Sequence, residues 1–466
     1  MLTNPLLRSL ALAGFLTLPV LSRANTPAVL RNWPQWRGPL ASGVAPEATP
    51  PVTWSETQNV KWKFAIPGFG TSTPIIWENQ VFLLTAVPVG EKTEVTAAPA
   101  ETGTPRPSPP SGEPPRPPRG GGSPGGGMRS ENPTQAHAFT VIAVDRQTGR
   151  PLWERVARVE VPHEGHHRDH GYASFSPVTD GEHLFVYFGS RGLYAYDLQG
   201  NRKWEKDLGD MSTRNSFGEG GSPALHGDVL VVQWDHEGDD FIAAFDKRTG
   251  RELWRRERDE LTTWSTPLVV VHGGRTQVVA NASNRIRSYD LHTGDQLWEC
   301  GGMTQNVIPT PVTDGALLYA LSGFRGAALL AIRLGRSGDL TDAADAIAWR
   351  YGRNTPYVPS PLLYDGRLYF CSGNNAMLSC FDTATGKPVL DAERINGVSG
   401  VYASPVGAAG RVYLVGRDGN TAVLKHAAPL EILAHNRLDD RFDASAAAVG
   451  GELFLRGHRH LYCLAE

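Results

Sequence analysis

The chain of 466 residues is poor in cysteine, with four scattered residues and no Cys-x-x-Cys pair. Such a pattern argues against a zinc knuckle. Cys371 and Cys380 flank a single predicted hairpin turn, and a tight turn at Asn374-Asn375 places them diagonally rather than opposite each other. We therefore favour two free thiols over a disulfide between these cysteines.

The chain also lacks long apolar runs. The longest, Leu10–Leu21, is too short to cross a membrane, so no transmembrane span is expected. It follows Arg8 and precedes the small-x-small site Ser22-Arg23-Ala24, which is typical of a secretory signal peptide over residues 1–24. We expect cleavage after Ala24 and a periplasmic or secreted protein; the cleavage site carries no cysteine for a lipid anchor.

Charge of one sign does not accumulate either. The formal net charge is −3 and becomes −5 when Arg8 and Arg23 leave with residues 1–24, while acidic and basic residues are interspersed. This distribution argues against a nucleic-acid partner. No Ser/His/Asp arrangement, phosphate loop or paired-carboxylate spacing stands out, so no catalytic residue is predicted.

What the chain has is a repeat. A proline that follows Ser or Thr opens a β-like run seven times, with intervals of 46, 44, 44, 50 and 44 residues from the second copy onward, and Ser445-Ala446 begins an eighth copy without the proline. The seven prolines are Pro74, Pro177, Pro223, Pro267, Pro311, Pro361 and Pro405. A period in the forties with several strands per unit predicts β-propeller blades.

A second motif, D-x-x-T-G-x-x-x-W, lies in the later half of the units. It occurs at Asp145–Trp153, Asp246–Trp254 and Asp290–Trp298, with a shorter copy at Asp197–Trp204. Asp and Thr close a side-chain-to-backbone turn, Gly supplies a positive φ, and we expect the Trp to return on the outer strand and cover the next blade.

These counts predict an all-β protein, an eight-bladed β-propeller of four-stranded antiparallel blades. The last unit ends after its third strand, and Val60–Phe64 supplies the missing one, so the N-terminal strand closes the ring. We divide the chain into a signal peptide (1–24), a Pro/Trp-rich lead-in (25–58) that lies against the ring through Trp33 and Trp36, and the propeller (59–466). A Pro/Gly-rich insertion, predicted to be disordered, occupies 87–136 between the second and third strands of the first blade.

The [ST]-P strand starts, the D-x-x-T-G-x-x-x-W units and the opening Trp33–Pro39 resemble the PQQ-like (pyrrolo-quinoline quinone repeat) β-propeller proteins. The resemblance implies a fold shared with quinoprotein alcohol dehydrogenases and with the BamB-like assembly lipoproteins. Quinoproteins cover the quinone with a disulfide between adjacent cysteines and hold Ca²⁺ beside a catalytic Asp; this chain has no Cys-Cys pair and no traceable calcium set. PQQ or a divalent metal remains a possible cofactor and none is assigned.

In most units an aromatic residue precedes the innermost strand. We expect these residues to surround the mouth of the central channel. With one interleaved polar residue, the predicted ligand-binding set is Phe69, Tyr172, Phe217, Trp264, Asn306, Tyr357, Tyr402 and Phe442. Aromatic faces with polar neighbours suit carbohydrate or peptide binding. The alternative is that they only pack neighbouring blades.

A histidine-rich connection leads into the second blade. Its four imidazoles, His163, His166, His167 and His170, are candidate ligands for Zn²⁺ or another divalent metal. The alternative is a solvated polar loop. Together the patterns predict a monomeric, non-catalytic binding or scaffold module for a protein or carbohydrate partner, with a PQQ- or metal-dependent oxidoreductase as the alternative.

Overall fold

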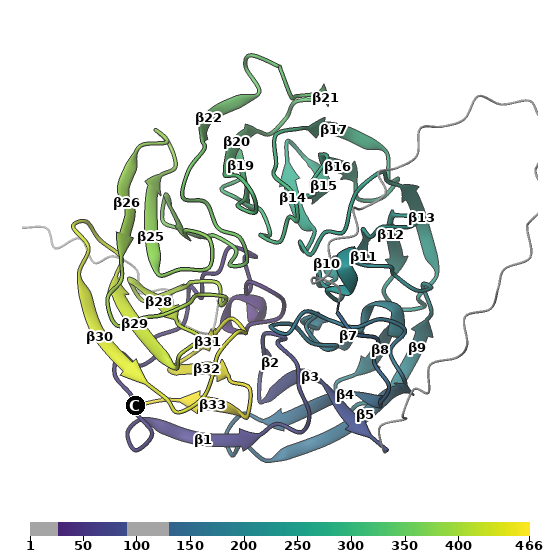
Figure 1. Cartoon of the computed structure of the whole chain (residues 1–466), viewed down its shortest axis with the longest axis vertical. Helices are drawn as coiled ribbons and strands as arrows, with labels where there is room; N and C mark the ends of the chain where they lie inside the picture. The colour runs from purple at the N-terminus through teal and green to yellow at the C-terminus, as the bar shows by residue number, and fades with distance from the viewer. Residues whose placement is uncertain (1–26, 91–129) are drawn as a thin grey trace, which may run out of the picture.

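The computed structural model describes residues 27–90 and 130–466, so the predicted signal peptide lies outside the described residues. Eight antiparallel sheets stand around a central axis like the blades of a propeller (Figure 1). The predicted eight-bladed β-propeller is therefore confirmed. Within the described ranges, the chain has no helix that is long and apolar enough to cross a membrane.

The first four blades follow one another along the chain, each with its innermost strand first. Their strands are β2 (Ile75–Trp77), β3 (Gln80–Val89), β4 (Ala136–Asp145) and β5 (Pro151–Glu160); β6 (Val178–Thr179), β7 (His183–Tyr187), β8 (Leu193–Asp197) and β9 (Arg202–Lys206); β10 (Ala224–His226), β11 (Val229–Trp234), β12 (Phe241–Asp246) and β13 (Glu252–Glu257); and β14 (Leu268–His272), β15 (Arg275–Ala280), β16 (Ile286–Asp290) and β17 (Gln296–Cys300).

The other four blades complete the ring. Their strands are β18 (Val312–Thr313), β19 (Leu317–Ser322), β20 (Ala328–Arg333) and β22 (Ile347–Tyr351); β23 (Leu362–Tyr364), β24 (Arg367–Cys371), β25 (Met377–Asp382) and β26 (Pro388–Arg394); β27 (Val406–Ala408), β28 (Arg411–Val415), β29 (Asn420–Lys425) and β30 (Ile432–Arg437); and β31 (Ala447–Val449), β32 (Glu452–Arg456), β33 (His460–Leu464) and β1 (Val60–Ala65). Short 3₁₀ turns occur at η2 (Ala28–Arg31), η3 (Gly189–Arg191) and η4 (Arg214–Ser216).

Closure of the ring joins the two ends of the chain. Strand β1 pairs antiparallel with β33, from Val60 opposite Leu464 to Ala65 opposite His460. The two strands lie side by side in Figure 1, purple against yellow. The N-terminal strand thus completes the eighth blade as predicted, which removes an open sheet edge.

The insertion leaves the first blade between β3 and β4, as predicted, but its bounds differ from those expected. The ladder between these strands continues to the pair Val89–Ala136, so residues 87–89 and 136 belong to strands rather than to the insertion. Hydrophobic Val87 and Val89 extend the alternating pattern of the strand, which explains the difference. The prediction of disorder concerns residues 91–129, which lie outside the described residues.

A Trp on the outermost strand of five blades locks its blade to the next, whereas Trp298 donates to Gln277 Oε1 of its own blade at 2.9 Å. The Trp204 indole N–H donates to Lys247 O at 2.9 Å, and its ring lies over Gly250, where an added Cβ would approach Trp204 Cδ2 to 2.8 Å. Trp62, Trp153, Trp254 and Trp349 make the same hydrogen bond to the turn of the following blade. The expected structural role of these tryptophans is confirmed.

The core consists of apolar residues on facing sheets, and it contains all four cysteines, which are free and buried. Cys371 pairs with Leu378 and Cys380 pairs with Tyr369 across the hairpin. The two cysteines are therefore diagonal, as the turn position predicted, and they form no disulfide.

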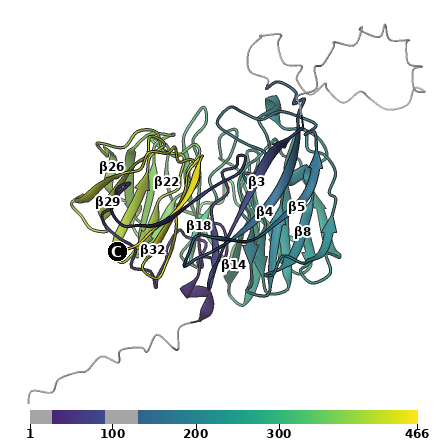
Figure 2. The same cartoon turned by 90° about the horizontal axis from the view of Figure 1, so that it is seen from below.

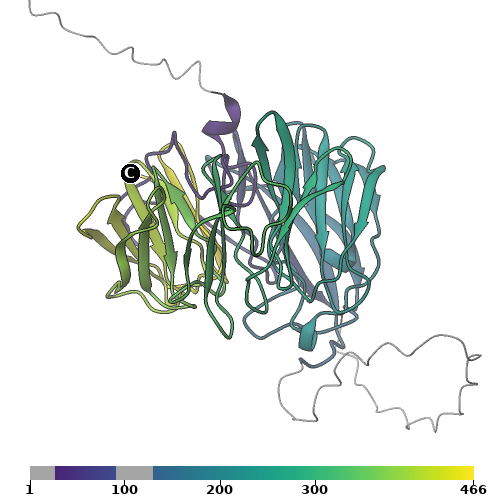
Figure 3. The ribbon, with the colours of Figure 1, turned by 90° about the horizontal axis from the view of Figure 1, so that it is seen from above.

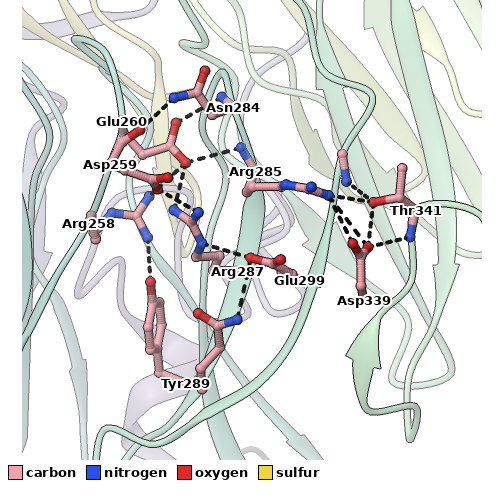
Figure 4. A network of polar contacts seen from close by, with 12 residues as sticks. Arg258, Asp259, Glu260, Asn284, Arg285, Arg287, Tyr289, Glu299, Asp339 and Thr341 are labelled. Carbon is pink, nitrogen blue, oxygen red and sulfur yellow. Dashed lines mark hydrogen bonds and ion pairs between the residues drawn. The ribbon is translucent and has the colours of Figure 1, made fainter. Parts of the chain in front are cut away.

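One blade has a strand more than expected. The 50-residue unit contains the additional strand β21 (Gly338–Asp339), which pairs in parallel with β17 of the preceding blade. Beside it, Arg285 Nη1 donates to Thr341 Oγ1 at 2.6 Å (Figure 4). The extra residues of this repeat thus connect two neighbouring blades.

Candidate functional site

The Ser and Thr residues of the [ST]-P motif form a ring of hydroxyl groups around the central channel. For seven of the eight residues, from Thr73 round to Ser404, the backbone N–H donates to the side-chain hydroxyl of the counterpart in the next blade, at 2.9 to 3.2 Å. The members of this hydroxyl ring are Thr73, Ser176, Ser222, Thr266, Thr310, Ser360, Ser404 and Ser445. The motif was visible in the sequence, but its role appears only when the blades are placed side by side.

The lead-in crosses one end of the channel. Trp33 forms a β-bridge with Ile76 of the first blade, whereas Arg37 Nη2 donates to Pro361 O and Pro405 O, both at 2.8 Å, in the sixth and seventh. Trp36 lies between them, and its indole N–H donates to Thr310 Oγ1 of the hydroxyl ring at 3.1 Å. The predicted packing of the lead-in through its two tryptophans is confirmed, and the segment closes the channel at this end.

Figures 2 and 3 show where the lead-in approaches the ring. The 3₁₀ turn η2, drawn in purple, projects from one face of the propeller near its centre. The end of β3 that leads to the insertion points toward the opposite face. The connection between the second and third blades lies on that opposite face, because Ser130 N, at the end of the insertion, donates to Asn215 O of this connection at 3.1 Å.

A cavity of about 450 Å³ fills the channel above the lead-in. Trp36 and all members of the hydroxyl ring except Thr73 contribute to its lining. One side of the wall is largely apolar and the other is polar. The apolar side includes Phe217, Trp264, Ile308, Phe324, Tyr357 and Val358, and the polar side includes His167, Arg168, Asp169, His170, Tyr402 and Asp443.

Four of the eight predicted ligand-binding residues line this cavity: Phe217, Trp264, Tyr357 and Tyr402. The sequence reasoning missed Phe324, whose ring stacks on Tyr357 with centroids 4.9 Å apart. Phe324 follows the second strand of its blade instead of preceding the first, so the repeat pattern gave no signal for it.

The other four predicted residues do not line the cavity. Phe442 is 1% exposed and packs in the core against Tyr462. Phe69 lies edge-on to His458, and Tyr172 lies edge-on to His166. The last member, Asn306, is buried. The spacing to the proline varies from three to six residues, so the side chains point in different directions.

The four histidines of the connection into the second blade do not converge on one point. His163 Nδ1 accepts a hydrogen bond from Arg191 Nη2 at 2.9 Å, and His163 Nε2 lies 2.5 Å from Met211 O. His170 has both ring nitrogens bonded, to Glu219 O at 2.8 Å and to Ser174 Oγ at 2.9 Å. Burial lowers the pKa of His170 to about 4, so this ring is neutral near pH 7.

Of these histidines, only His163 belongs to a candidate metal-ligand group within the described ranges. It shares that group with Glu164 and Glu219, whose ligand atoms and its own lie within 4.8 Å of one another. Burial raises the pKa of Glu164 despite hydrogen bonds from Thr213. The adjacent Arg191 guanidinium already uses a nitrogen of His163, which disfavours a cation there. The metal site on the four histidines stays a prediction.

The same histidine-rich connection crosses the mouth of the cavity. On one side His167 N donates to Phe217 O at 2.9 Å. On the other, Asp169 Oδ1 forms ion pairs with Arg417 and Arg441, each at 2.8 Å. We call residues 163–172 the crossing loop. Because it is held on both sides, it partly covers the cavity and places His167 and Asp169 on the wall.

Arg417 organises the polar side of the cavity. Its guanidinium carbon lies 3.7 Å from the centroid of the Tyr402 ring, and its Nη2 donates to Asp443 at 3.1 Å as well as to Asp169. Asp443 also accepts from His458 Nε2 at 2.8 Å. Both cavity carboxylates are thus held in ion pairs with arginine and fixed in place.

A second network of charges lies away from the cavity. Arg258 and Asp235 form an ion pair with fully buried side chains at 2.6 Å, and Arg258 Nη1 donates to Tyr289 Oη at 2.8 Å. Glu260 accepts from Arg287 Nη1 at 3.0 Å and from backbone N–H groups of the next blade (Figure 4). None of these residues lines the cavity, so we assign the network to the attachment of the third blade to the fourth.

A family model described as outer membrane protein assembly factor BamB matches residues 137–338. No curated protein sequence matches the chain significantly. The solved structure of BamB from Moraxella catarrhalis has a TM-score of 0.50 at 14% identity, and the match covers 70% of this chain and 93% of that one.

Two further structures show the same fold. Quinohemoprotein alcohol dehydrogenase from Comamonas testosteroni has a TM-score of 0.56 at 10% identity over 95% of this chain and 81% of its own. The computationally designed protein Ika8 has a TM-score of 0.51 at 14% identity over 72% of this chain and 94% of its own. The chain is an eight-bladed β-propeller. The resemblance to the PQQ-like propeller proteins is confirmed by the family model over residues 137–338, and these solved structures share the fold.

Proposed function

We propose that this protein is a binding module that holds part of a glycan or protein partner in the central cavity. The cavity itself supports this proposal. It has a closed floor, one aromatic side and one polar side, and at about 450 Å³ it has the size of a site for one or two sugar rings or a large side chain. An apolar face beside fixed hydrogen-bonding groups suits a ring that is apolar on its face and polar at its edge.

The ion pairs and hydrogen bonds of the polar side chains favour a binding site over a catalytic site. A general acid or base needs a proton that it can exchange near the working pH. Asp169 and Asp443 are both paired with Arg417, and His170 has both nitrogens engaged. These groups are therefore arranged to orient a ligand.

The quinone-dependent oxidoreductase is the alternative, because a quinohemoprotein dehydrogenase shares the fold. The residues present do not fit that arrangement. All four cysteines are free, and none lines the cavity, so no pair of cysteines covers a ring bound there. The acidic candidate metal groups, His163 with Glu164 and Glu219, and Asp180 with Glu182 and His183, contribute no residue to the cavity lining. We derive no reaction step through a quinone.

The cellular setting belongs to the same proposal. A signal peptide over residues 1–24 with cleavage after Ala24 would deliver a monomeric protein to the periplasm or the outside of the cell, where glycans and exported proteins are its partners. Mass spectrometry of the mature N-terminus after expression in a Gram-negative host tests this. A mature chain that begins at Met1 in the cytoplasm would contradict it.

A binding screen with two matched variants tests the main proposal. Mono- and disaccharides and short peptides are titrated while tryptophan fluorescence is recorded, since Trp36 and Trp264 line the cavity. Phe324→Ala removes a cavity ring, and Phe64→Ala removes a half-buried phenylalanine on the outer strand β1, outside the cavity. We expect a ligand whose affinity falls roughly tenfold in Phe324→Ala and stays unchanged in Phe64→Ala. Equal loss in both variants, or turnover of an alcohol with added quinone, would overturn the proposal.

A further inference from the structure

The floor of the cavity is rich in hydrogen-bond donors and poor in acceptors. Each ring hydroxyl from Ser176 to Ser445 accepts a backbone N–H, and Thr310 also accepts from Trp36. A hydroxyl group has one proton to donate in addition to its lone pairs. Across the part of the chain that the structure describes, none of these seven hydroxyls donates to a protein acceptor. Seven O–H groups therefore remain available around the channel axis.

A buried guanidinium lies directly next to this ring. Arg37 is 1% exposed, and its Nη2 donates to the carbonyls of Pro361 and Pro405, the residues that follow Ser360 and Ser404 of the ring. Its Nε and Nη1 are buried without a partner, and within residues 27–90 and 130–466 no carboxylate forms an ion pair with it. Burial lowers the pKa of Arg37 to about 9. A buried cation in this state is stabilised by a nearby anion.

A second arginine repeats this arrangement where the ring closes. Arg456, also 1% exposed, donates to Ser72 O at 3.2 Å, and its Nε and Nη2 have no partner in the described ranges. The neighbouring Thr73 is the one ring member whose hydroxyl accepts no backbone N–H, and its Oγ1 is buried and unpaired. Two uncompensated positive charges are thus buried close to the hydroxyl ring.

The negative charges of the cavity do not cancel this effect. Asp169 and Asp443 lie on the wall at the mouth, and each is already paired with Arg417. Arg441 adds a further positive charge to both. The floor therefore retains an excess of donors with positive charge buried behind it, and the wall carboxylates are already paired with arginine.

We propose that the hydroxyl ring, with Arg37 buried behind it and outside the cavity lining, is a carboxylate-binding floor and that the ligand is an acidic sugar, a uronic acid at the end of a glycan. This assignment rests on the proposed function and specifies its ligand class. The aromatic side, with Trp264 and Phe324, contacts the face of the sugar ring, and the carboxylate points down to the O–H groups. The lead-in closes the floor, so the site accepts the end of a chain and excludes its interior.

A matched pair of sugars isolates the floor. D-glucuronate and D-glucose share ring size and stereochemistry, but the first has a carboxylate where the second has a hydroxymethyl group. Calorimetric titration of both therefore reports how much the carboxylate contributes to the binding affinity. We expect glucuronate to bind at least roughly tenfold more tightly, as hydrogen bonds to a charged group provide. Acetate and inorganic phosphate, titrated alone, separate a free anion from an anion carried by a sugar.

Two variants locate the effect. Arg37→Gln removes the charge and retains amide donors, and Ser404→Ala removes one O–H donor; glucose binding in each variant reports whether the cavity is intact. The preference for glucuronate should disappear in Arg37→Gln and weaken in Ser404→Ala. If Arg37→Gln does not fold, Ser404→Ala still decides the question. A preference that both variants retain, or acetate binding as tightly as glucuronate, would overturn the assignment.

The remaining outcomes separate this inference from the proposed function. Equal binding of glucuronate and glucose, with both weakened in Phe324→Ala, would overturn the carboxylate floor and leave the binding module in place. If neither sugar binds and no other glycan or peptide of the screen binds, the carboxylate-binding floor and the binding module are both wrong.

Discussion

Asp169 and Arg417 are 248 residues apart in the chain and form an ion pair of 2.8 Å across the mouth of the central cavity. Asp169 comes from the connection between the first two blades, and Arg417 follows β28 in the seventh. Their contact fixes the crossing loop over the cavity and orients the Tyr402 ring beneath the guanidinium. Solvent screens the attraction between partly buried charged side chains less than the attraction between charges on the open surface.

The first prediction concerns this ion pair. Asp169→Asn keeps the size of the side chain and removes its charge, so the crossing loop should be held less firmly. We expect faster backbone amide exchange at residues 163–172 and a melting temperature within a few degrees of the native one, because loops open locally without global unfolding. Asp342→Asn, at an exposed carboxylate far from the crossing loop in the chain, is the control. Unchanged exchange in the crossing loop would show that Asp169 does not hold it.

The second prediction tests the lock between blades. Gly250→Ala places a methyl group 2.8 Å from the Trp204 ring at a φ of 68°, whereas Gly227→Ala has a φ of 58° and no atom within 4 Å. Both variants carry the backbone cost of about 1 kcal/mol for a positive φ, and only the first must also displace the indole. Chemical unfolding should therefore show Gly250→Ala to be less stable by about 1–3 kcal/mol more than Gly227→Ala. Equal losses would remove the interlocking role of the Trp.

The third prediction concerns ring closure. A chain that begins at Thr71 lacks β1 and leaves β33 as an open edge, so it should lose cooperative thermal unfolding. A chain that begins at Gln58 keeps β1 and loses the lead-in, and it should unfold cooperatively at a lower temperature, because Trp33 and Trp54 no longer bury their rings. Differential scanning calorimetry distinguishes the two. Cooperative unfolding of the shorter chain would contradict closure by β1.

The fourth prediction is a dependence of stability on pH. His170 is half-buried, and the loss of solvent around its ring lowers its folded pKa to about 4, below the ordinary value of 6.5. The folded state therefore binds fewer protons than the unfolded state, and the contribution of His170 is present above pH 6.5 and is lost as the pH falls toward 4. The slope amounts to at most about 1.4 kcal/mol per pH unit. His170→Gln should flatten the unfolding free energy between pH 6.5 and 4.5, whereas His292→Gln, at an exposed histidine, should leave the slope unchanged.

The fifth prediction concerns the insertion. The β3–β4 ladder is complete from Gln80–Asp145 to Val89–Ala136. Removal of residues 91–129 with a short Gly/Ser connection should therefore keep the melting temperature within a few degrees, since loop length changes closure entropy slowly. Thermal unfolding monitored by circular dichroism measures this. A large loss of stability would show that the removed segment contributes to packing.

The site was only partly predictable, and the reason is geometric. Spacing along the chain identified Phe217, Trp264, Tyr357 and Tyr402, because equivalent positions in a repeat face the same axis. The same rule also selected Phe442, which turns into the core, and it missed Phe324, which reaches the cavity from another loop. A difference of a residue or two in a loop redirects a side chain, and a repeat pattern does not register that difference.

The sequence by itself determined the number of blades, the closing strand and the role of the repeated tryptophans, because these features depend on contacts that recur in every unit. The tertiary structure alone decided which groups meet on the central axis. Asp169 and Arg417, or Arg37 and the hydroxyl ring, come from distant units and become neighbours only when eight blades close around one channel. Periodicity encodes contacts between adjacent blades, and the cavity is formed by contacts across the ring, which no local pattern specifies.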